Sequence, residues 1–179
     1  MKATGIVRRI DDLGRVVIPK EIRRTLKIRE GDPLEIFTNH DGEVIFKKYS
    51  PIGELGEFAS QYAETLYKTS GYPVCITDKD SIIAIAGASK KDFFEKPFSN
   101  DVEKIMEEKT SFIAKGDKRL SVTDSTPNYT AGVVCPIISD GDTIGNVIVM
   151  QDDVRQNVSD TELKLANAAS MFLAKQMEI

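Results

Sequence analysis

Residues 4–19 read TGIVRRIDDLGRVVIP, and their pattern sets the expected fold of the N-terminal part of the chain. Two short runs rich in β-branched residues, 6–10 and 15–18, flank residues 11–14, where a glycine suits the positive φ of a tight turn. Pro19 ends the second run and presets φ for a helix start. The stretch therefore predicts a β-hairpin followed by a helix.

Outward from this stretch, the pattern predicts a short helix and a second hairpin. Residues 20–27 carry apolar side chains four apart, with an acid near the start and bases near the end, as the helix dipole favours. Gly31 is expected to stop this helix. Runs 34–37 and 44–47 flank the turn pair Asp41-Gly42. The first 50 residues contain few large apolar side chains and can barely form a core alone. We therefore expect an obligate dimer with strands exchanged between chains.

Charge is divided unevenly along the chain. The first 50 residues carry 11 Lys and Arg against 8 Asp and Glu, a net charge of +3. Because the whole chain carries −4, the remainder carries −7. Binding to a polyanion depends on local charge, so a nucleic-acid partner is expected to dock on the N-terminal part.

The quoted stretch, continued by EIRRTL at 21–26 and KKY at 47–49, closely resembles the AbrB-type transition-state regulators. The resemblance implies a dimeric swapped-hairpin β-barrel with one short helix that binds double-stranded DNA. On the family pattern, the DNA-facing set is Arg8, Arg15, Arg23 and Arg24. Secondary contacts are expected from Lys2, Arg9 and Lys20.

The arginine side chain fits this role, because its planar fork matches phosphate oxygens or guanine edges. Without a family pattern, the same arginines would be interpreted as solvated surface charge. The sequence predicts no long exposed recognition helix, which favours recognition of DNA shape over helix-turn-helix contacts in one groove.

The rest of the chain is expected to form one acidic body after a linker at 51–56, which contains a proline and two glycines. Its expected helices cover 57–70, about 101–109 with a cap at Asn100 and Glu103, and a closing helix to about 177 behind a Ser159/Glu162 capping box. Its expected strands cover 74–77, 82–86, 111–114, 120–122, 132–138 and 143–150, with an irregular polar stretch after residue 86.

This element order resembles a GAF domain, carried by GVVCPII at 132–138, an Asp-Gly turn, TIGNVIV at 143–149 and VSDTEL at 158–163. The resemblance implies an antiparallel sheet flanked by helices, with a small ligand between the sheet and the irregular segment. A filled core that serves only for association is the alternative. No nucleotide-binding signature is present, so the sequence does not identify the ligand. Apolar stripes on the first and last helices predict a second dimer interface, and hence a tetramer.

The sequence offers few candidate residues for catalysis or metal binding. Cys75 and Cys135 lie inside apolar strand runs and are expected to be small core residues without a disulfide or a metal. His40, the single histidine, lies in a turn-like stretch. No apolar run approaches the roughly 20 residues that cross a bilayer, and the start lacks a signal segment, so a cytoplasmic, nucleoid-associated protein is expected.

Together these features predict an α+β protein with a DNA-binding and dimerisation domain at 1–50 and a GAF-like domain at 57–179. The combination resembles transcription regulators of spore-forming bacteria, which implies a non-enzymatic activator and repressor of sporulation genes. Two alternatives remain. Swapped-hairpin domains also occur in antitoxins, usually with a disordered tail, and some GAF domains reduce sulfoxides with exposed cysteines.

Overall fold

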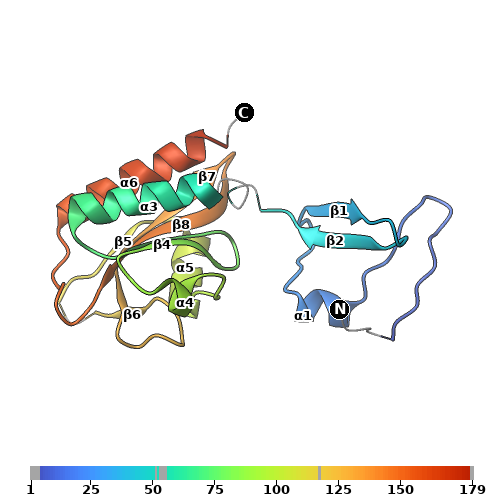
Figure 1. Cartoon of the computed structure of the whole chain (residues 1–179), viewed down its shortest axis with the longest axis horizontal. Coiled ribbons are helices and arrows are strands. Elements are labelled where there is room, and N and C mark those ends of the chain that lie inside the picture. The colour runs from blue at the N-terminus through green and yellow to red at the C-terminus, as the bar shows by residue number, and fades with distance from the viewer. Residues whose placement is uncertain (1–4, 51, 53–55, 117, 178–179) are drawn as a thin grey trace. The chain divides into compact units, whose positions relative to one another are not determined.

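The computed structural model describes residues 5–50, 52, 56–116 and 118–177 (Figure 1). The chain divides into two compact units, Met1–Tyr49 and Ser50–Ile179. The expected linker at 51–56 falls mostly outside the described residues, although Ile52 is fully buried in the core of the second unit.

The first unit contains one helix and one hairpin. Helix α1 spans Lys20–Thr25, and strands β1 (Leu34–Thr38) and β2 (Val44–Lys48) pair antiparallel. Asn39 closes the hairpin, since its Oδ1 accepts from the backbone N–H groups of residues 41 and 43 at 3.1 and 2.9 Å. The second predicted hairpin is therefore confirmed.

Helix α1 ends earlier than predicted, and Gly31 does not end it. Lys27 takes the left-handed conformation, with φ of 51°. The N–H of Ile28 then bonds to the carbonyl of Arg23 at 2.7 Å, and that of Lys27 to Arg24 at 3.3 Å. These two bonds form a Schellman motif, with lysine where glycine is usual. The motif satisfies the last carbonyls and keeps α1 to six residues.

The first predicted hairpin forms only its turn. The Asp11 carboxylate accepts from the N–H groups of Leu13 and Arg15 at 3.1 and 2.7 Å, and Gly14 has φ of 76°. Residues 5–10 and 15–19 adopt no strand, so that part of the prediction is wrong for the single chain. Within the described part of the first unit these segments have no neighbouring strand, and a strand persists only when its backbone groups find partners.

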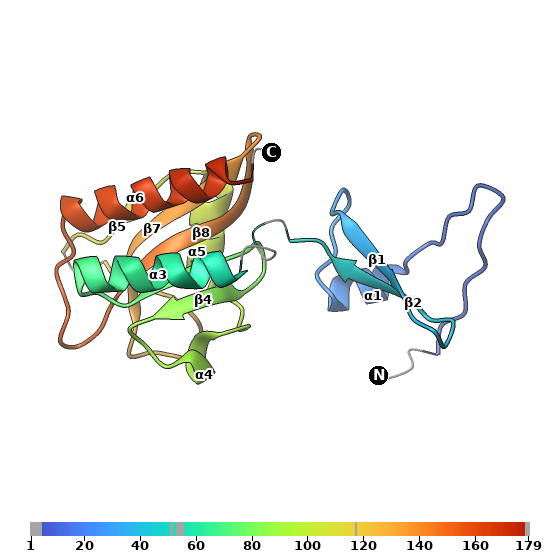
Figure 2. The ribbon, with the colours of Figure 1, turned by 45° about the horizontal axis from the view of Figure 1, so that its top comes forward.

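The second unit is a three-layer structure around one antiparallel sheet (Figure 2). Strands follow the order β4-β3-β8-β7-β5, and β6 also pairs with β7. Their bounds are β3 Val74–Thr77, β4 Ile82–Ala86, β5 Phe112–Ile113, β6 Leu120–Ser121, β7 Thr130–Ser139 and β8 Asp142–Gln151. The helices are α3 Gly56–Ser70, α4 Lys90–Phe93, α5 Asn100–Glu108 and α6 Asp160–Lys175.

Alternating side chains of the strands build two separate cores. Val74, Ile76 and Val147 point toward α3 and α6, which lie side by side on one face (Figure 2). Cys75 and Ile148 point to the other face, where α4 and α5 cover the sheet. This alternation places both faces of the sheet in apolar contact.

Several local predictions are confirmed in this unit, and two are corrected. The limits of β3 and β4 agree with the expected ones, and the Ser159/Glu162 capping box forms at the start of α6. Ser99 rather than Asn100 caps α5, because its Oγ accepts from the N–H of Val102. The stretch expected to be irregular contains the short helix α4.

Candidate nucleic-acid interface

The cations predicted to contact DNA are distributed over three segments of the first unit. Arg8 and Arg9 lie on the extended segment before the turn, Arg15 follows the turn, and Arg23 and Arg24 form the last turn of α1. Arg23 is half-buried and the others are exposed. Within the described residues, no hydrogen bond or ion pair joins the three segments to one another through these side chains. Lys20 is exposed at the first position of α1, and Lys2 lies outside the described residues.

Most of these cations keep their charge available. Among the residues that the structure describes, Arg8, Arg9, Arg23 and Arg24 form no ion pair. Arg15 is different, since its Nε donates to Asp11 Oδ2 at 2.8 Å. Hydrogen bonds from the backbone and then the side chain of Arg15 lower the pKa of Asp11 below its ordinary value. The contact uses Nε, and the Arg15 side chain is 69% exposed.

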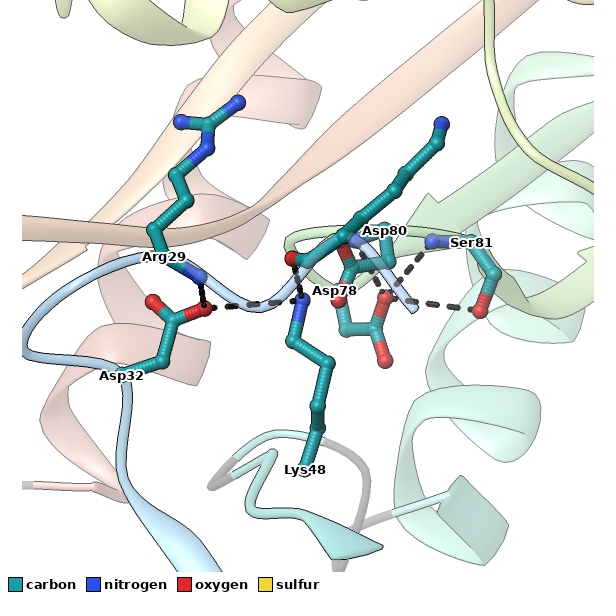
Figure 3. Close-up of polar contacts among 7 residues, drawn as sticks. Arg29, Asp32, Lys48, Asp78, Asp80 and Ser81 are labelled. Atoms are coloured by element: carbon teal, nitrogen blue, oxygen red, sulfur yellow. Dashed lines mark hydrogen bonds and ion pairs between the residues drawn. The ribbon is translucent and has the colours of Figure 1, made fainter. Parts of the chain in front are cut away.

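The end of α1 is tied to the second hairpin by a small polar cluster (Figure 3). Lys48 of β2 donates to the carbonyl of Lys27 at 2.9 Å and lies 3.7 Å from the Asp32 carboxylate. Asp32 in turn accepts from the N–H of Arg29 at 2.8 Å. These contacts fix the direction of α1, and therefore of its two arginines, relative to β2. The sequence analysis did not identify this cluster, because its members are separated by up to 21 positions.

Figure 3 also draws a polar turn that belongs to the second unit. There the Asp78 carboxylate accepts from the N–H groups of Asp80 and Ser81 at 2.8 and 2.7 Å. This arrangement is an Asx-type turn that closes the β3–β4 hairpin.

The first unit lacks a core of its own. In its described part, Pro19 is the one buried residue. Large apolar side chains are exposed instead, including Val7 at 86%, Val17 at 70% and Ile36 at 61%. So much apolar surface on about 45 described residues is far from the usual state of a folded monomer, and it indicates a surface that another chain covers.

A second apolar surface lies on the helices of the second unit. The rings of Phe58 and Tyr62 on α3 stack against Phe172 of α6, with centroids 5.9 and 5.6 Å apart. Phe172 is 42% exposed and its neighbour Met171 is 73% exposed. We call Phe58, Tyr62 and Phe172 the aromatic patch.

The side of the sheet where a ligand was expected is occupied by the chain's own side chains. Phe93, Val122, Ile148 and Met150 are fully buried there. One buried polar atom in the second unit, Asn146 Oδ1, has no hydrogen-bond partner among the described residues.

Neither cysteine lies in a position that suits a reactive thiol. Both thiols are free and buried, which confirms the expectation that Cys75 and Cys135 are core residues. Burial raises the pKa of Cys75 strongly and that of Cys135 to about 11, so the reactive thiolate is scarce near neutral pH. The described residues contain no group of three or more His, Cys, Asp or Glu that could hold a metal ion, and no described helix is long and apolar enough to cross a membrane.

Comparisons with known proteins match both units. A family model described as "Stage V sporulation protein T C-terminal, transcription factor" matches residues 54–178. A second, described as "Antidote-toxin recognition MazE, bacterial antitoxin", matches residues 7–53. Stage V sporulation protein T of Bacillus subtilis (strain 168) is 52% identical over 182 residues, which cover 99% of each chain.

Two further similarities concern the separate units. The transition state regulatory protein AbrB of Bacillus subtilis (strain 168) is 63% identical over 51 residues, which are 28% of this chain and 52% of AbrB. The GAF domain from Acinetobacter phosphoenolpyruvate-protein phosphotransferase is 10% identical and superposes with a TM-score of 0.56, over 69% of this chain and 81% of that one. At that identity the likeness shows the fold alone, and it confirms the expected GAF-like architecture.

Proposed function

The chain belongs to the stage V sporulation protein T family of transcription factors, and from this premise we propose how it binds DNA. The first unit is an AbrB-type DNA-binding and dimerisation domain. Arg8, Arg15, Arg23 and Arg24 hold the phosphate backbone, and Arg9, Lys20 and Lys2 add secondary contacts. Bound in this way at sporulation promoters, the protein activates some genes and represses others. As a regulator it acts in the bacterial cytoplasm, on the nucleoid.

The observation that carries this proposal is the combination of Arg8, Arg23 and Arg24, which form no ion pair among the described residues, with a unit whose described part has no core. Residues 6–10 and 15–18 of one chain pair with the same segments of a second chain, which covers Val7 and Val17 and completes the strands. The pairing doubles the DNA-facing set to eight arginines on one side of a dimer. An interlaced dimer of this kind is obligate, because a single copy has too little buried surface to be stable.

Recognition depends on DNA shape more than on base edges. Helix α1 has six residues and ends in a Schellman motif, so it is too short to lie along a major groove as a recognition helix does. Arginines spread over two segments and a short helix suit a deformable site, where the energy of bending or narrowing the duplex contributes to selectivity.

Fluorescence anisotropy with labelled promoter DNA tests the proposed set. An Arg8→Ala, Arg23→Ala variant removes four contacts from a dimer and is expected to weaken binding by about 100-fold. Lys91→Ala, on exposed α4 of the second unit, is the matched control and is expected to bind as the parent does. Equal affinity of the double variant and the parent would mean that the DNA-binding surface lies elsewhere.

The second unit joins dimers into a tetramer through the aromatic patch on α3 and α6. Support comes from the exposed ring of Phe172, stacked on two neighbours that belong to the other helix of the pair. A symmetric pair of such patches buries the rings against their own copies, as an isologous interface does. Sedimentation equilibrium of the intact chain is expected to give a mass near four times 19.8 kDa; a mass of two chains at micromolar concentration would exclude this association.

The second unit serves association and not thiol chemistry. The side of its sheet where a GAF ligand was expected is filled by Phe93, Ile148 and Met150, which supports the filled-core alternative. A Cys75→Ser, Cys135→Ser variant is expected to keep full DNA affinity and the tetrameric mass. Loss of either property, with the fold intact, would require a role for the thiols.

An antitoxin role has one finding in its favour, the family model that matches residues 7–53. Antitoxins of this type carry a tail that folds on the toxin, whereas this chain continues into a packed sheet. We expect residues 1–50 and 57–179 to be separate domains, so limited proteolysis should cut at 51–56 and leave the second domain intact. Rapid digestion of the second domain would favour the antitoxin alternative.

A further inference from the structure

A polar groove of about 420 Å³ lies on the second unit, apart from the arginines and the aromatic patch described above. Described residues of three segments line it, namely the loop between β5 and β6, the segment that leads into the start of β7, and the segment from the end of β8 toward α6. No residue of the aromatic patch lines it. The proposed functions above leave this groove unused.

One wall of the groove, residues 151–158, is held firmly against the sheet. Gly132 of β7 makes this possible, because a Cβ at that position would lie 2.6 Å from Val158 Cγ1. In the amide orientation that satisfies both of its ends, Gln151 Oε1 accepts from the N–H groups of Asn157 and Val158 at 2.9 and 3.3 Å. That orientation turns the amide nitrogen of Gln151 toward hydrogen-bond acceptors of the chain itself.

Part of the negative charge on this wall is already engaged in hydrogen bonds and an ion pair. Asp152 Oδ1 accepts from the N–H groups of Val154 and Arg155 at 3.0 and 2.6 Å, and its second oxygen lies 3.6 Å from the Arg155 guanidinium. The Arg155 guanidinium therefore offsets part of the charge of this carboxylate. Among the described residues that line the groove, Asp153 is exposed at the rim and opposes an anion without such a contact.

The facing wall carries three cations on one short loop. Lys115, Lys118 and Arg119 are exposed and line the groove. They form no ion pair with any residue that the structure describes, and the Lys118 ammonium lies 5.2 Å from the centroid of the Phe112 ring. Residues 115–119 hold these three cations and one acid, Asp117, a net charge of +2 in a part of the chain whose net charge is −7 from residue 51 onward. The concentration of cations is therefore local and faces the groove.

We propose that this groove binds a phosphate group. Arg119 supplies a planar fork for two phosphate oxygens, and Lys115 and Lys118 supply compact positive charge. The amide group of Asn128 adds a neutral donor from another loop. Two sources have this chemistry, a soluble phosphorylated molecule and the backbone of DNA that extends past the first unit.

The test is isothermal titration with pyrophosphate in the full-length chain. It is done in the Arg8→Ala, Arg23→Ala background, so that anion binding by the first unit is reduced. Adding Lys115→Ala and Arg119→Ala is expected to weaken pyrophosphate binding by about tenfold or more. Asp153→Asn removes the opposing charge and is expected to tighten binding about threefold. Lys91→Ala is the control and should change nothing.

The source is then identified in the chain with its first unit intact. If Lys115→Ala, Arg119→Ala weakens pyrophosphate binding and leaves promoter affinity unchanged, the groove serves a soluble phosphorylated molecule. If the same variant also weakens promoter binding, the groove holds DNA backbone. The proposal is overturned if pyrophosphate binding does not saturate, if the double variant binds it as tightly as its parent, or if Lys91→Ala weakens it equally. Circular dichroism of each variant establishes that the fold is retained.

Discussion

Removal of the Phe172 ring is expected to separate the tetramer into dimers. The ring stacks on Phe58 and Tyr62 within its own chain, yet 42% of the residue remains exposed. For a phenylalanine of about 200 Å², this leaves about 85 Å² for a partner to cover, or about 2 kcal/mol at 25 cal/mol per Å². A symmetric interface contains the ring twice, which is about 4 kcal/mol per interface, and a tetramer of two dimers contains two such interfaces. Phe172→Ala should therefore cost about 8 kcal/mol, or about 10⁶-fold in the dissociation constant between dimers.

Sedimentation equilibrium over a range of protein concentrations measures this constant directly. The parent is expected to remain tetrameric where Phe172→Ala has fallen to dimers of about 40 kDa, twice the chain mass of 19.8 kDa. Val154→Ala is the matched control, because Val154 is 89% exposed on a loop outside the helices. A variant that stays tetrameric as far down in concentration as the parent, or a control that dissociates equally, would refute the assignment of the interface to the aromatic patch.

Two further predictions concern the stability of the second unit, measured by urea unfolding. Gly145→Ala would place a Cβ 2.0 Å from the carbonyl oxygen of Thr77 and is expected to cost about 3 kcal/mol, whereas Gly56→Ala, which meets nothing within 4 Å, should be near neutral. Glu162→Ala should cost about 1 kcal/mol at pH 7 by breaking the α6 capping box. Burial opposes ionisation of Glu162, but hydrogen bonds from Ser159 outweigh it and lower the pKa below 4.5. A lowered pKa stabilises the folded chain above the unfolded value, so the cost of Glu162→Ala should shrink as pH falls from 4.5 through the folded pKa; a cost independent of pH would contradict this.

The parts of the fold that depend on local pattern could be predicted from the sequence. Alternation and turn residues defined β3 and β4, and the spacing of Ser159 and Glu162 defined the start of α6. Helix α4 was missed, because four residues carry too little periodicity to separate a helical turn from a loop. Ser99 and Asn100 are both good capping residues, and tertiary contact decides between them, since the Ser99 hydroxyl also bonds to the Ser121 carbonyl.

The DNA-facing role of the four arginines comes from the family resemblance and stays a prediction. The pairing of Arg15 with Asp11 could not be predicted, because it depends on the geometry of one tight turn. The strands at 6–10 and 15–18 have the right composition, but a single chain gives them no neighbour to pair with. Composition can indicate that a strand is favoured; it does not indicate whether the partner strand belongs to the same chain.

The dependence of DNA affinity on salt tests the central claim most directly, namely that the eight arginines of a dimeric first unit neutralise DNA phosphates. If all eight meet phosphate, log K should fall with log salt at a slope of about −7, and Arg23→Ala, Arg24→Ala, which removes four of the eight contacts, should halve the slope to about −3.6. Lys91→Ala should keep the parent slope. An unchanged slope in the arginine variant would contradict the assignment of these side chains to the DNA backbone.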